Sequence, residues 1–200
     1  MDLRTVRIAV VGDSGVGKSC LVHYLCHKTV LTHPKWTIGC TTEVLLYQDE
    51  TFIEFVDIGG NPRYELSRSA YYDELHGIIF VYDMSNIRSY NNLKKWIAEL
   101  NQAQKYRPNV AAINVDRVGA LPTLVIGNKQ DLVQTQRVAP LRDLKMESIE
   151  ASAVQGRIDQ NRFHLFLDRV IATAFAAAPS AHRSRVPVTS PSSSMSRGWW

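Results

Sequence analysis

The stretch GDSGVGKS occupies residues 12–19 and satisfies the pattern GxxxxGK[ST]. It follows a short apolar run at residues 6–11 and precedes residues 18–27, in which apolar side chains recur at helical spacing. A glycine-rich turn that merely starts a helix is the alternative, but Lys18 and Ser19 both stand where the pattern requires them. The stretch therefore predicts a strand, a tight loop and a helix in succession, the opening unit of many α/β folds.

The glycines of this loop allow successive backbone N–H groups to point at phosphate oxygens, with the dipole of the following helix behind them. Lys18 is then expected to contact the β and γ phosphates of a nucleotide, and the Ser19 hydroxyl to ligate Mg²⁺. The residues predicted to bind the phosphates are Gly15, Val16, Gly17, Lys18, Ser19 and Cys20.

Short apolar runs and amphipathic segments alternate along the rest of the chain. Two β-branched and aromatic runs flank a polar connection suited to a hairpin, and two continuous apolar runs suit strands buried on both faces of a sheet. The predicted strands and helices lie, in order, at residues 6–11, 18–27, 42–47, 51–57, 77–82, 90–100, 121–127, 146–150 and 163–175. This order predicts an α/β fold with a mostly parallel, doubly wound six-stranded sheet flanked by helices.

Length and composition indicate one domain. The chain has 200 residues, 45% hydrophobic and 21% charged, which suffices for a single well-filled core and is short for two. Residues 1–178 are assigned to this domain, whereas residues 179–200 are rich in serine, proline and arginine and are expected to be disordered. The three cysteines have no metal-ligand spacing, and their odd number argues against a disulfide framework.

Charge and hydropathy argue against several other classes of protein. The net charge of +4 is modest and the basic residues are spread along the chain, so nucleic-acid binding is not expected. We see neither a signal-peptide pattern nor an apolar stretch of about 20 residues, and expect a soluble, cytoplasmic protein. The spacing of His23, His27, His33 and His76 suggests no metal or acid–base site, and none is assigned a role.

The motif NKQD at residues 128–131 follows the apolar run at residues 121–127, at the edge where a nucleotide base would lie. The Asp131 carboxylate can accept hydrogen bonds from the N1–H and 2-amino groups of guanine, whereas adenine would leave it desolvated and unpaired. Asn128 is expected to tie the motif to the phosphate loop, and the Lys129 stem to pack along the base. Such a motif alone is often a polar turn, but behind a phosphate loop it predicts selection of guanine.

Together these motifs resemble the Ras superfamily of small GTPases, and residues 6–175 resemble its Rab branch best. Within that branch, residues 35–40, 76–83 and 92–96 are similar to the Rab-like protein 3 family. The resemblance implies a P-loop NTPase G domain that binds GTP or GDP with Mg²⁺ and acts with effectors, exchange factors or GTPase-activating proteins. It also implies a role in intracellular traffic or in handling other small GTPases, and it suggests homodimerisation.

The resemblance also assigns the switch residues and the last nucleotide loop. Asp57 and Gly60 match the pattern DxxG, in which the aspartate holds Mg²⁺ through water and the glycine N–H senses the γ phosphate. Thr37 resembles the first-switch threonine, which completes the metal shell only with GTP, although a strand-edge threonine is the plainer interpretation. Ser152 and Ala153 resemble the loop whose alanine N–H reads the guanine 6-oxo group. The predicted metal ligands are Ser19, Thr37 and Asp57.

Three departures from this family pattern carry functional expectations. Asn61 stands where these proteins place a glutamine that orients the attacking water; it is one methylene shorter and precedes the rigid Pro62, so hydrolysis should be slow. Val30 replaces an aromatic residue whose edge meets the guanine, so nucleotide exchange should be fast. The sequence ends without cysteines for prenylation, so only transient membrane contact through partners is expected. The predicted catalytic residues are Lys18, Gly60 and Asn61.

Three alternative functions are consistent with these residues. The first is a switch that hydrolyses GTP, and the second is a nucleotide-dependent binding module, dimeric or not, that scarcely hydrolyses it. The third is a P-loop ATPase or nucleoside kinase, which predicts no selectivity for guanine. The presence of Ser19, Thr37, Asp57 and Gly60 favours the switch. Asn61 and Val30 favour the binding module.

Overall fold

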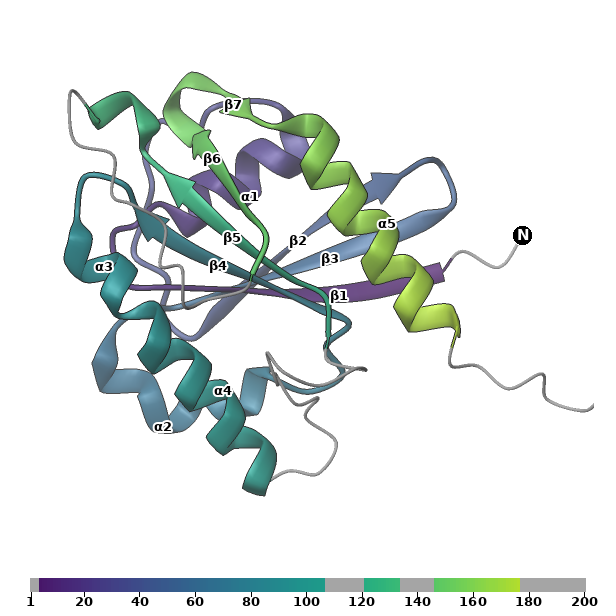
Figure 1. The fold of residues 1–200 in the computed structure, drawn as a ribbon, viewed down its shortest axis with the longest axis horizontal. Helices are drawn as coiled ribbons and strands as arrows, with labels where there is room; N and C mark the ends of the chain where they lie inside the picture. Colours follow the sequence, from purple (N-terminus) through teal and green to yellow (C-terminus); the bar gives the residue numbers. More distant parts are fainter. Residues whose placement is uncertain (1–3, 107–120, 134–145, 177–200) are drawn as a thin grey trace, which may run out of the picture.

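The computed structural model describes residues 4–106, 121–133 and 146–176, so the tail expected at residues 179–200 lies outside the described residues. These residues form a seven-stranded sheet with helices on both faces (Figure 1). The strands are β1 (Arg4–Val11), β2 (Cys40–Tyr47), β3 (Thr51–Ile58), β4 (Gly77–Asp83), β5 (Thr123–Asn128), β6 (Ser148–Ser152) and β7 (Arg157–Ile158). The helices are α1 (Lys18–His27), α2 (Glu65–Arg68), α3 (Ile87–Asn91), α4 (Leu93–Tyr106) and α5 (Gln160–Ala176).

The central strand β1 shows why the sheet is covered on both faces. Successive side chains of a strand point to opposite sides, and all four side chains from Ile8 to Val11 are buried. Ile8 and Val10 belong to a core cluster with α1 and α5, whereas Ala9 and Val11 belong to a second cluster with α3 and α4. These two pairs of helices lie on opposite sides of the sheet in Figure 1. The continuous apolar runs in the sequence therefore reflect two packed faces.

The strand pairing confirms the predicted fold class. The sheet order is β2-β3-β1-β4-β5-β6-β7. β1 pairs in parallel with β3 and β4, and β5 and β6 continue the parallel array, whereas β2 and β3 form an antiparallel hairpin. The prediction of six strands missed β7, a strand of 2 residues that pairs antiparallel with β6. So short a strand cannot show the alternation by which strands are found in a sequence.

The helix predicted at residues 90–100 differs most from the structure, which has α3 and α4 there, together covering a longer segment. Asn86 accepts a 3.1 Å hydrogen bond from the backbone N–H of Arg88 and so caps α3. This polar cap, and not the apolar periodicity, sets where the helical region begins. Within the described part of the chain, no helix combines the length and apolarity that a membrane span needs.

The carboxyl ends of the parallel strands meet at one edge of the sheet, where folds of this class bind their ligands. β1 lies between β3 and β4: the chain passes from β1 to the β2-β3 side of the sheet and then crosses to β4 on the other side. Folds of this class bind their ligands at such a switch point. The segments that carry the predicted site residues follow β1, β3, β5 and β6. The topology therefore brings motifs that are distant in sequence to a single edge.

Candidate nucleotide site

The loop after β1 wraps tightly around the start of α1. Gly12, Gly15 and Gly17 have positive φ angles of 148°, 81° and 92°, which favour glycine. A Cβ on Gly17 would also lie 2.4 Å from the side-chain nitrogen of Asn128, so no larger residue fits there. α1 starts at Lys18, and its N-cap residue Gly17 has no side chain to accept from the first N–H groups of the helix. These donors can therefore serve an anion in the loop.

The Lys18 ammonium is enclosed by the same loop. Its Nζ donates to the carbonyl oxygens of Gly12 and Asp13 at 2.8 and 3.0 Å, and the residue is only 6% exposed. Burial lowers the pKa of Lys18 to about 8, against the opposing attraction of Asp57 and Asp13. A polyanion placed beside Nζ would favour the charged ammonium and raise this pKa again.

Three oxygen-bearing side chains converge next to the loop. The Ser19 hydroxyl lies 3.0 Å from the Thr37 hydroxyl and donates to Oδ2 of Asp57 at 2.5 Å. Thr37 also donates to this carboxylate oxygen, at 3.1 Å. The other oxygen, Oδ1 of Asp57, is buried and has no hydrogen-bond partner among the described residues. A partnerless carboxylate oxygen beside two hydroxyls is a donor set suited to a hard divalent cation, so these residues fit Mg²⁺.

A pocket of about 310 Å³ opens over the phosphate loop. Residues 14–15 and 17–20 form its floor, and residues 34–37, Gly60 and Lys129 contribute to its walls. A Cβ on Gly60 would lie 2.4 Å from the backbone nitrogen of Ser14, so the segment after β3 packs directly on the loop. The structure therefore gathers most of the predicted phosphate and switch residues around one cavity, with Val16 buried behind them.

Asn128, at the end of β5, joins three segments of the site. Its Nδ2 donates to the carbonyl oxygen of Val16 at 2.9 Å, and its Oδ1 accepts from the backbone N–H of Ala153 at 3.1 Å. The Asn128 side chain is fully enclosed. The Ala153 N–H, expected to read the guanine 6-oxo group, is thus already engaged and must share or exchange this partner to do so.

The remaining residues of the 128–131 motif are also held by side-chain partners. The Ser152 hydroxyl donates to Oδ1 of Asp131 and so orients that carboxylate. Lys129 lies with its Nζ 2.7 Å from Oδ2 of Asp83, which keeps the lysine stem extended along the pocket. Burial by itself raises the pKa of Asp83, but hydrogen bonds from Lys129 and Ser85 outweigh it and leave that pKa below its ordinary value. Both contacts arrange the motif before any ligand binds.

Asn61 has a structural task in addition to its predicted catalytic one. Its Oδ1 accepts a 3.0 Å hydrogen bond from the backbone N–H of Arg63 and caps the short 3-10 turn Pro62–Tyr64. The backbone carbonyl oxygen of Asn61 accepts a hydrogen bond from the Arg68 guanidinium at 2.8 Å. The amide oxygen expected to orient a water is therefore committed to a helix cap.

Behind the loop lies a layer of contacts that the motifs did not predict. Asp13 accepts hydrogen bonds from the Trp96 indole at 2.9 Å and from the Asn92 amide at 2.7 Å. The Arg68 guanidinium lies 4.4 Å from the Trp96 ring centroid and 2.6 Å from a carboxylate oxygen of Glu99. The one signal in the sequence was the spacing of Asn92 and Trp96, which places both on one helix face.

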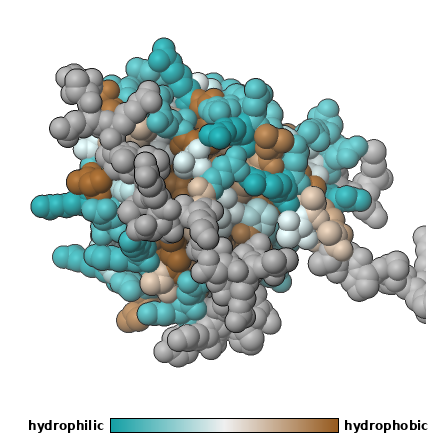
Figure 2. Space-filling view, in the orientation of Figure 1, coloured by the Kyte–Doolittle hydropathy of each residue, from teal (hydrophilic) through white to brown (hydrophobic). Residues whose placement is uncertain are grey.

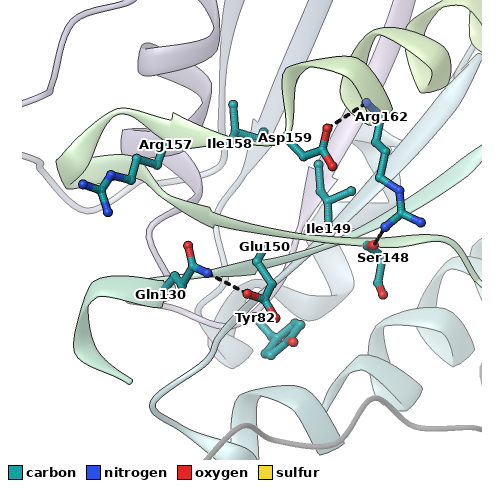
Figure 3. A pocket seen from close by; sticks show the side chains of 9 residues that line it. All are labelled: Tyr82, Gln130, Ser148, Ile149, Glu150, Arg157, Ile158, Asp159 and Arg162. Carbon is teal, nitrogen blue, oxygen red and sulfur yellow. Dashed lines mark hydrogen bonds between the residues drawn. The ribbon is translucent and has the colours of Figure 1, made fainter. Parts of the chain in front are cut away.

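A larger cavity, of about 530 Å³, lies beside β6 and the start of α5 (Figure 3). Its polar side chains pair with neighbouring groups: Gln130 donates to Glu150 at 2.7 Å, and Arg162 donates to the Ser148 carbonyl at 3.2 Å. No residue of the loop at residues 12–19 lines it. The smaller pocket over that loop is therefore the candidate nucleotide site.

Large apolar side chains are exposed on the two segments that flank the nucleotide pocket. Trp36 and Ile38 are 86% and 77% exposed, and Leu66 is 94% exposed. The coloured part of the face drawn in Figure 2 is mainly hydrophilic, with apolar side chains in small separate groups. Apolar side chains so fully exposed on adjoining loops are typical of surfaces that contact other proteins.

Comparisons with known proteins agree with this geometry. A sequence model of the Ras family matches residues 7–171. Rab-like protein 3 of Mus musculus is 33% identical over 201 aligned positions, which cover 84% of this chain and 85% of the mouse protein. Rab-like protein 3 of Homo sapiens is 37% identical over 154 positions, covering 68% of this chain and 65% of that protein. The small GTPase-like protein LIP2 of Arabidopsis thaliana is 37% identical over 145 positions, covering 64% of this chain and 43% of that protein.

Proposed function

The chain belongs to the Ras family of small GTPases and is related to Rab-like proteins, and on this premise we propose that it is a GTP-binding switch with slow intrinsic hydrolysis. One observation carries the proposal: the phosphate loop, the Ser19–Thr37–Asp57 group and the guanine motif surround one edge of the sheet. We further propose that the switch works in the cytoplasm, in intracellular traffic or on other small GTPases.

The phosphates would occupy the pocket over residues 12–19. The Lys18 ammonium already lies within hydrogen-bond distance of two carbonyl oxygens of the loop, so it can turn to the β and γ phosphates without a change of backbone. The uncapped N–H groups at the start of α1 supply further donors. Lys18 then stabilises the charge that develops on the transferring phosphoryl group.

Mg²⁺ would be held by Ser19 and Asp57, with Thr37 completing the set when GTP is bound. When bound, the metal supplies Lewis-acid neutralisation of the phosphate oxygens. The hydroxyls of Ser19 and Thr37 both contact the Asp57 carboxylate, so the loop before β2 is joined to the phosphate loop through that carboxylate. Loss of the γ phosphate would weaken this junction and release residues 34–39, and this change of order is the signal of the switch.

Guanine would be selected by Asp131. The hydroxyl of Ser152 orients its carboxylate, and Lys129 offers an apolar stem beside the base. Adenine lacks the paired donors that the carboxylate needs, so ATP would leave a desolvated charge without a partner. This selection distinguishes the proposed switch from a P-loop ATPase or nucleoside kinase.

The exposed side chains Trp36, Ile38 and Leu66 are proposed to contact effectors, exchange factors or GTPase-activating proteins. They lie on the segments that the γ phosphate would order, so partner binding would depend on the nucleotide. A second copy of the chain is an alternative partner for the same surface. We propose no nucleic-acid partner.

The test of guanine binding is calorimetry with Mg²⁺ present, comparing GDP with ADP. We expect GDP to bind at least 100-fold more tightly, since a site built to pair polar groups rejects an analogue that lacks them. The Asp131→Asn variant should lose this preference and gain affinity for xanthosine diphosphate, whose 2-oxo group accepts from the new amide. Equal affinity of the unaltered protein for GDP and ADP would refute the proposal.

A nucleotide-dependent binding module that scarcely hydrolyses GTP is the second candidate, favoured by the capping role of Asn61. Single-turnover hydrolysis separates the two, with GTP preloaded on the protein. The switch predicts a slow rate that exceeds the rate of a Lys18→Ala control. Equal rates would leave only the binding module.

A further inference from the structure

A second group of potential ligands meets between α1 and β2. His23 and His27 lie on α1 and Glu43 lies on β2, and one ligand atom from each falls within 4.8 Å of the others. Oε2 of Glu43 is 2.9 Å from Nε2 of His27 and 3.7 Å from Nδ1 of His23. None of the three residues lines the pocket over the phosphate loop. The group is therefore separate from the nucleotide site.

The two imidazoles share a face of α1 because residues four apart are neighbours on a helix surface. Their ring centroids are 4.6 Å apart. β2 is the edge strand of the sheet, and Glu43 reaches α1 from it. The sequence spacing alone suggested no site here, because the third ligand is contributed by another element.

The lone pairs on the carboxylate oxygen of Glu43 and on the ring nitrogens of His23 and His27 repel one another at these short distances. A cation between them would offset this repulsion. Oε2 of Glu43 is buried and has no hydrogen-bond partner within the described segments of the chain, although Nε2 of His27 lies 2.9 Å from it. Nε2 of His23 lies 3.2 Å from the Thr29 hydroxyl. Donation of its proton to Thr29 would leave the lone pair on Nδ1, facing Glu43, which is how histidine ligands of metals are usually fixed.

We propose that His23, His27 and Glu43 form a zinc site with an open fourth position. For metal–ligand distances of about 2.0–2.1 Å, neighbouring ligands of tetrahedral zinc lie about 3.3 Å apart, and the two measured separations fall on either side of this value. Imidazole favours zinc over Mg²⁺ or Ca²⁺. A carboxylate with two histidines four residues apart on a helix is a donor set that zinc accepts.

The position of the site suggests what the metal controls. The segment that contains Val30 and Thr37 leaves the end of α1 and enters β2, so a metal held by both elements would fix the two ends of that segment. Zinc bound there would slow nucleotide release. This consequence, unlike the site itself, rests on the proposed function.

Titration of the GDP- and Mg²⁺-loaded protein with Zn²⁺ by calorimetry tests the site. We expect one equivalent to bind, with affinity reduced about tenfold or more in His27→Ala and in Glu43→Gln. His33→Ala is the matched control, since the His33 imidazole lies on the segment between α1 and β2 but outside the group of three ligands. This variant should bind zinc like the unaltered protein. No binding, or binding that these two variants leave unchanged, would overturn the proposal and leave only the contacts of the two histidines with Glu43.

Cobalt gives a test that needs no variant. Co²⁺ in a tetrahedral site of nitrogen and oxygen ligands shows visible absorption bands without a thiolate charge-transfer band. We expect this spectrum from the unaltered protein; a thiolate band would replace our ligand set with one that includes a cysteine.

Release of fluorescent GDP, measured in excess Mg²⁺ with and without one equivalent of Zn²⁺, tests the consequence for exchange. Zinc should slow release several-fold in the unaltered protein and leave the rate unchanged in His27→Ala. An equal effect of zinc in both proteins would refute the proposed effect of this site on nucleotide release. Guanine preference is measured without zinc, so a protein that prefers GDP but binds no zinc loses only this inference. A protein that binds zinc without preferring GDP loses the proposed function and the effect on nucleotide release, and keeps the zinc site.

Discussion

The indole N–H of Trp96 donates a 2.9 Å hydrogen bond to Asp13, which directly follows the first glycine of the phosphate loop. The amide of Asn92 donates to the other oxygen of the same carboxylate at 2.7 Å. Residues 92–96, at the start of α4, thus hold the loop through two charge-assisted hydrogen bonds. Such bonds are stronger than neutral ones, so the shape of the phosphate loop depends on a helix that contains no nucleotide motif.

Removal of this carboxylate should loosen nucleotide binding. In Asp13→Ala the buried Trp96 indole and the half-buried Asn92 amide lose their acceptor, which costs about 1–3 kcal/mol. We expect a lower melting temperature. If the lost free energy destabilises the nucleotide-bound state, GDP release should be roughly 5- to 100-fold faster. Trp96→Phe is the matched control, because it removes one N–H and keeps a ring under Arg68. It should show a smaller change, and no change in either variant would contradict the role of the contact.

The buried ion pair between Arg68 and Glu99 should be worth more than a surface pair. Their side chains are 4% and 14% exposed, and the Tyr72 hydroxyl also donates to Glu99. Burial and the neighbouring Glu99 both raise the pKa of Tyr72, which keeps that hydroxyl protonated as a donor. Glu99→Ala leaves the guanidinium buried without its counter-charge, so we expect a loss of about 3–5 kcal/mol in urea denaturation.

The double variant Arg68→Met with Glu99→Leu removes both charges and should recover most of this loss, because an apolar pair of similar volume can replace a buried ion pair. Equal destabilisation by the single and double variants would show that packing, not charge, is what these residues contribute.

The parts of the site that could be predicted from the sequence are those formed by contiguous residues. The phosphate loop and the motif at residues 128–131 each carry their own turn chemistry, and parallel topology brings their strand ends to one edge. Helix α1 was predicted with its observed bounds, because a glycine loop starts it and apolar spacing continues it. Local chemistry was sufficient for these elements.

The contacts that escaped prediction join side chains from distant elements. Trp96 is separated from Asp13 by 83 positions, and its place in the apolar period of α4 predicts burial without indicating where its N–H points. His27 and Glu43 likewise look like surface residues until β2 is placed beside α1. Periodicity predicts which face of an element is buried, but not which polar atom lies opposite.

The lowered pKa of Lys18 predicts that nucleotide binding takes up a proton in alkaline solution. In the nucleotide-free folded protein this pKa is about 8, below its ordinary value of 10.5. Between these values the unfolded chain holds the proton and the folded chain does not, so the Lys18 contribution favours folding more as pH rises through this window. Bound phosphates would raise the pKa again, so GDP binding at pH 9 should take up close to one proton through Lys18.

Calorimetry in two buffers with different ionisation enthalpies measures this uptake. The terminal phosphate of GDP titrates near pH ~6, so its own contribution shrinks as the solution becomes more alkaline, opposite to that of Lys18. We therefore expect greater proton uptake at pH 9 than at pH 7. An uptake that falls steadily over this range would show that the Lys18 ammonium is already charged before the nucleotide arrives.

Val30 should permit fast nucleotide exchange. Its side chain is 40% exposed, and the family pattern has at this position an aromatic ring whose edge meets the guanine, a contact worth ~0.5–1.5 kcal/mol. Val30→Phe is therefore expected to slow release of fluorescent GDP by about 2- to 10-fold. Val30→Leu adds apolar volume without a ring and serves as the control. Equal slowing by leucine and phenylalanine would assign the effect to size alone.

Asn61→Gln should raise intrinsic hydrolysis. Asn61 is one methylene shorter than glutamine, and its Oδ1 is engaged by the Arg63 N–H. Glutamine caps helices less readily and reaches one methylene further, which frees and extends the amide. Because a misplacement of ~1 Å can cost about 100-fold in rate, partial restoration should give roughly a tenfold increase in single-turnover hydrolysis. Asn61→Ala also removes the cap, at about 1 kcal/mol, but supplies no amide and should not accelerate the reaction. If Asn61→Gln is no faster than Asn61→Ala, side-chain reach is not what limits hydrolysis, and the rigid Pro62 or the absence of a partner's arginine must set the rate instead.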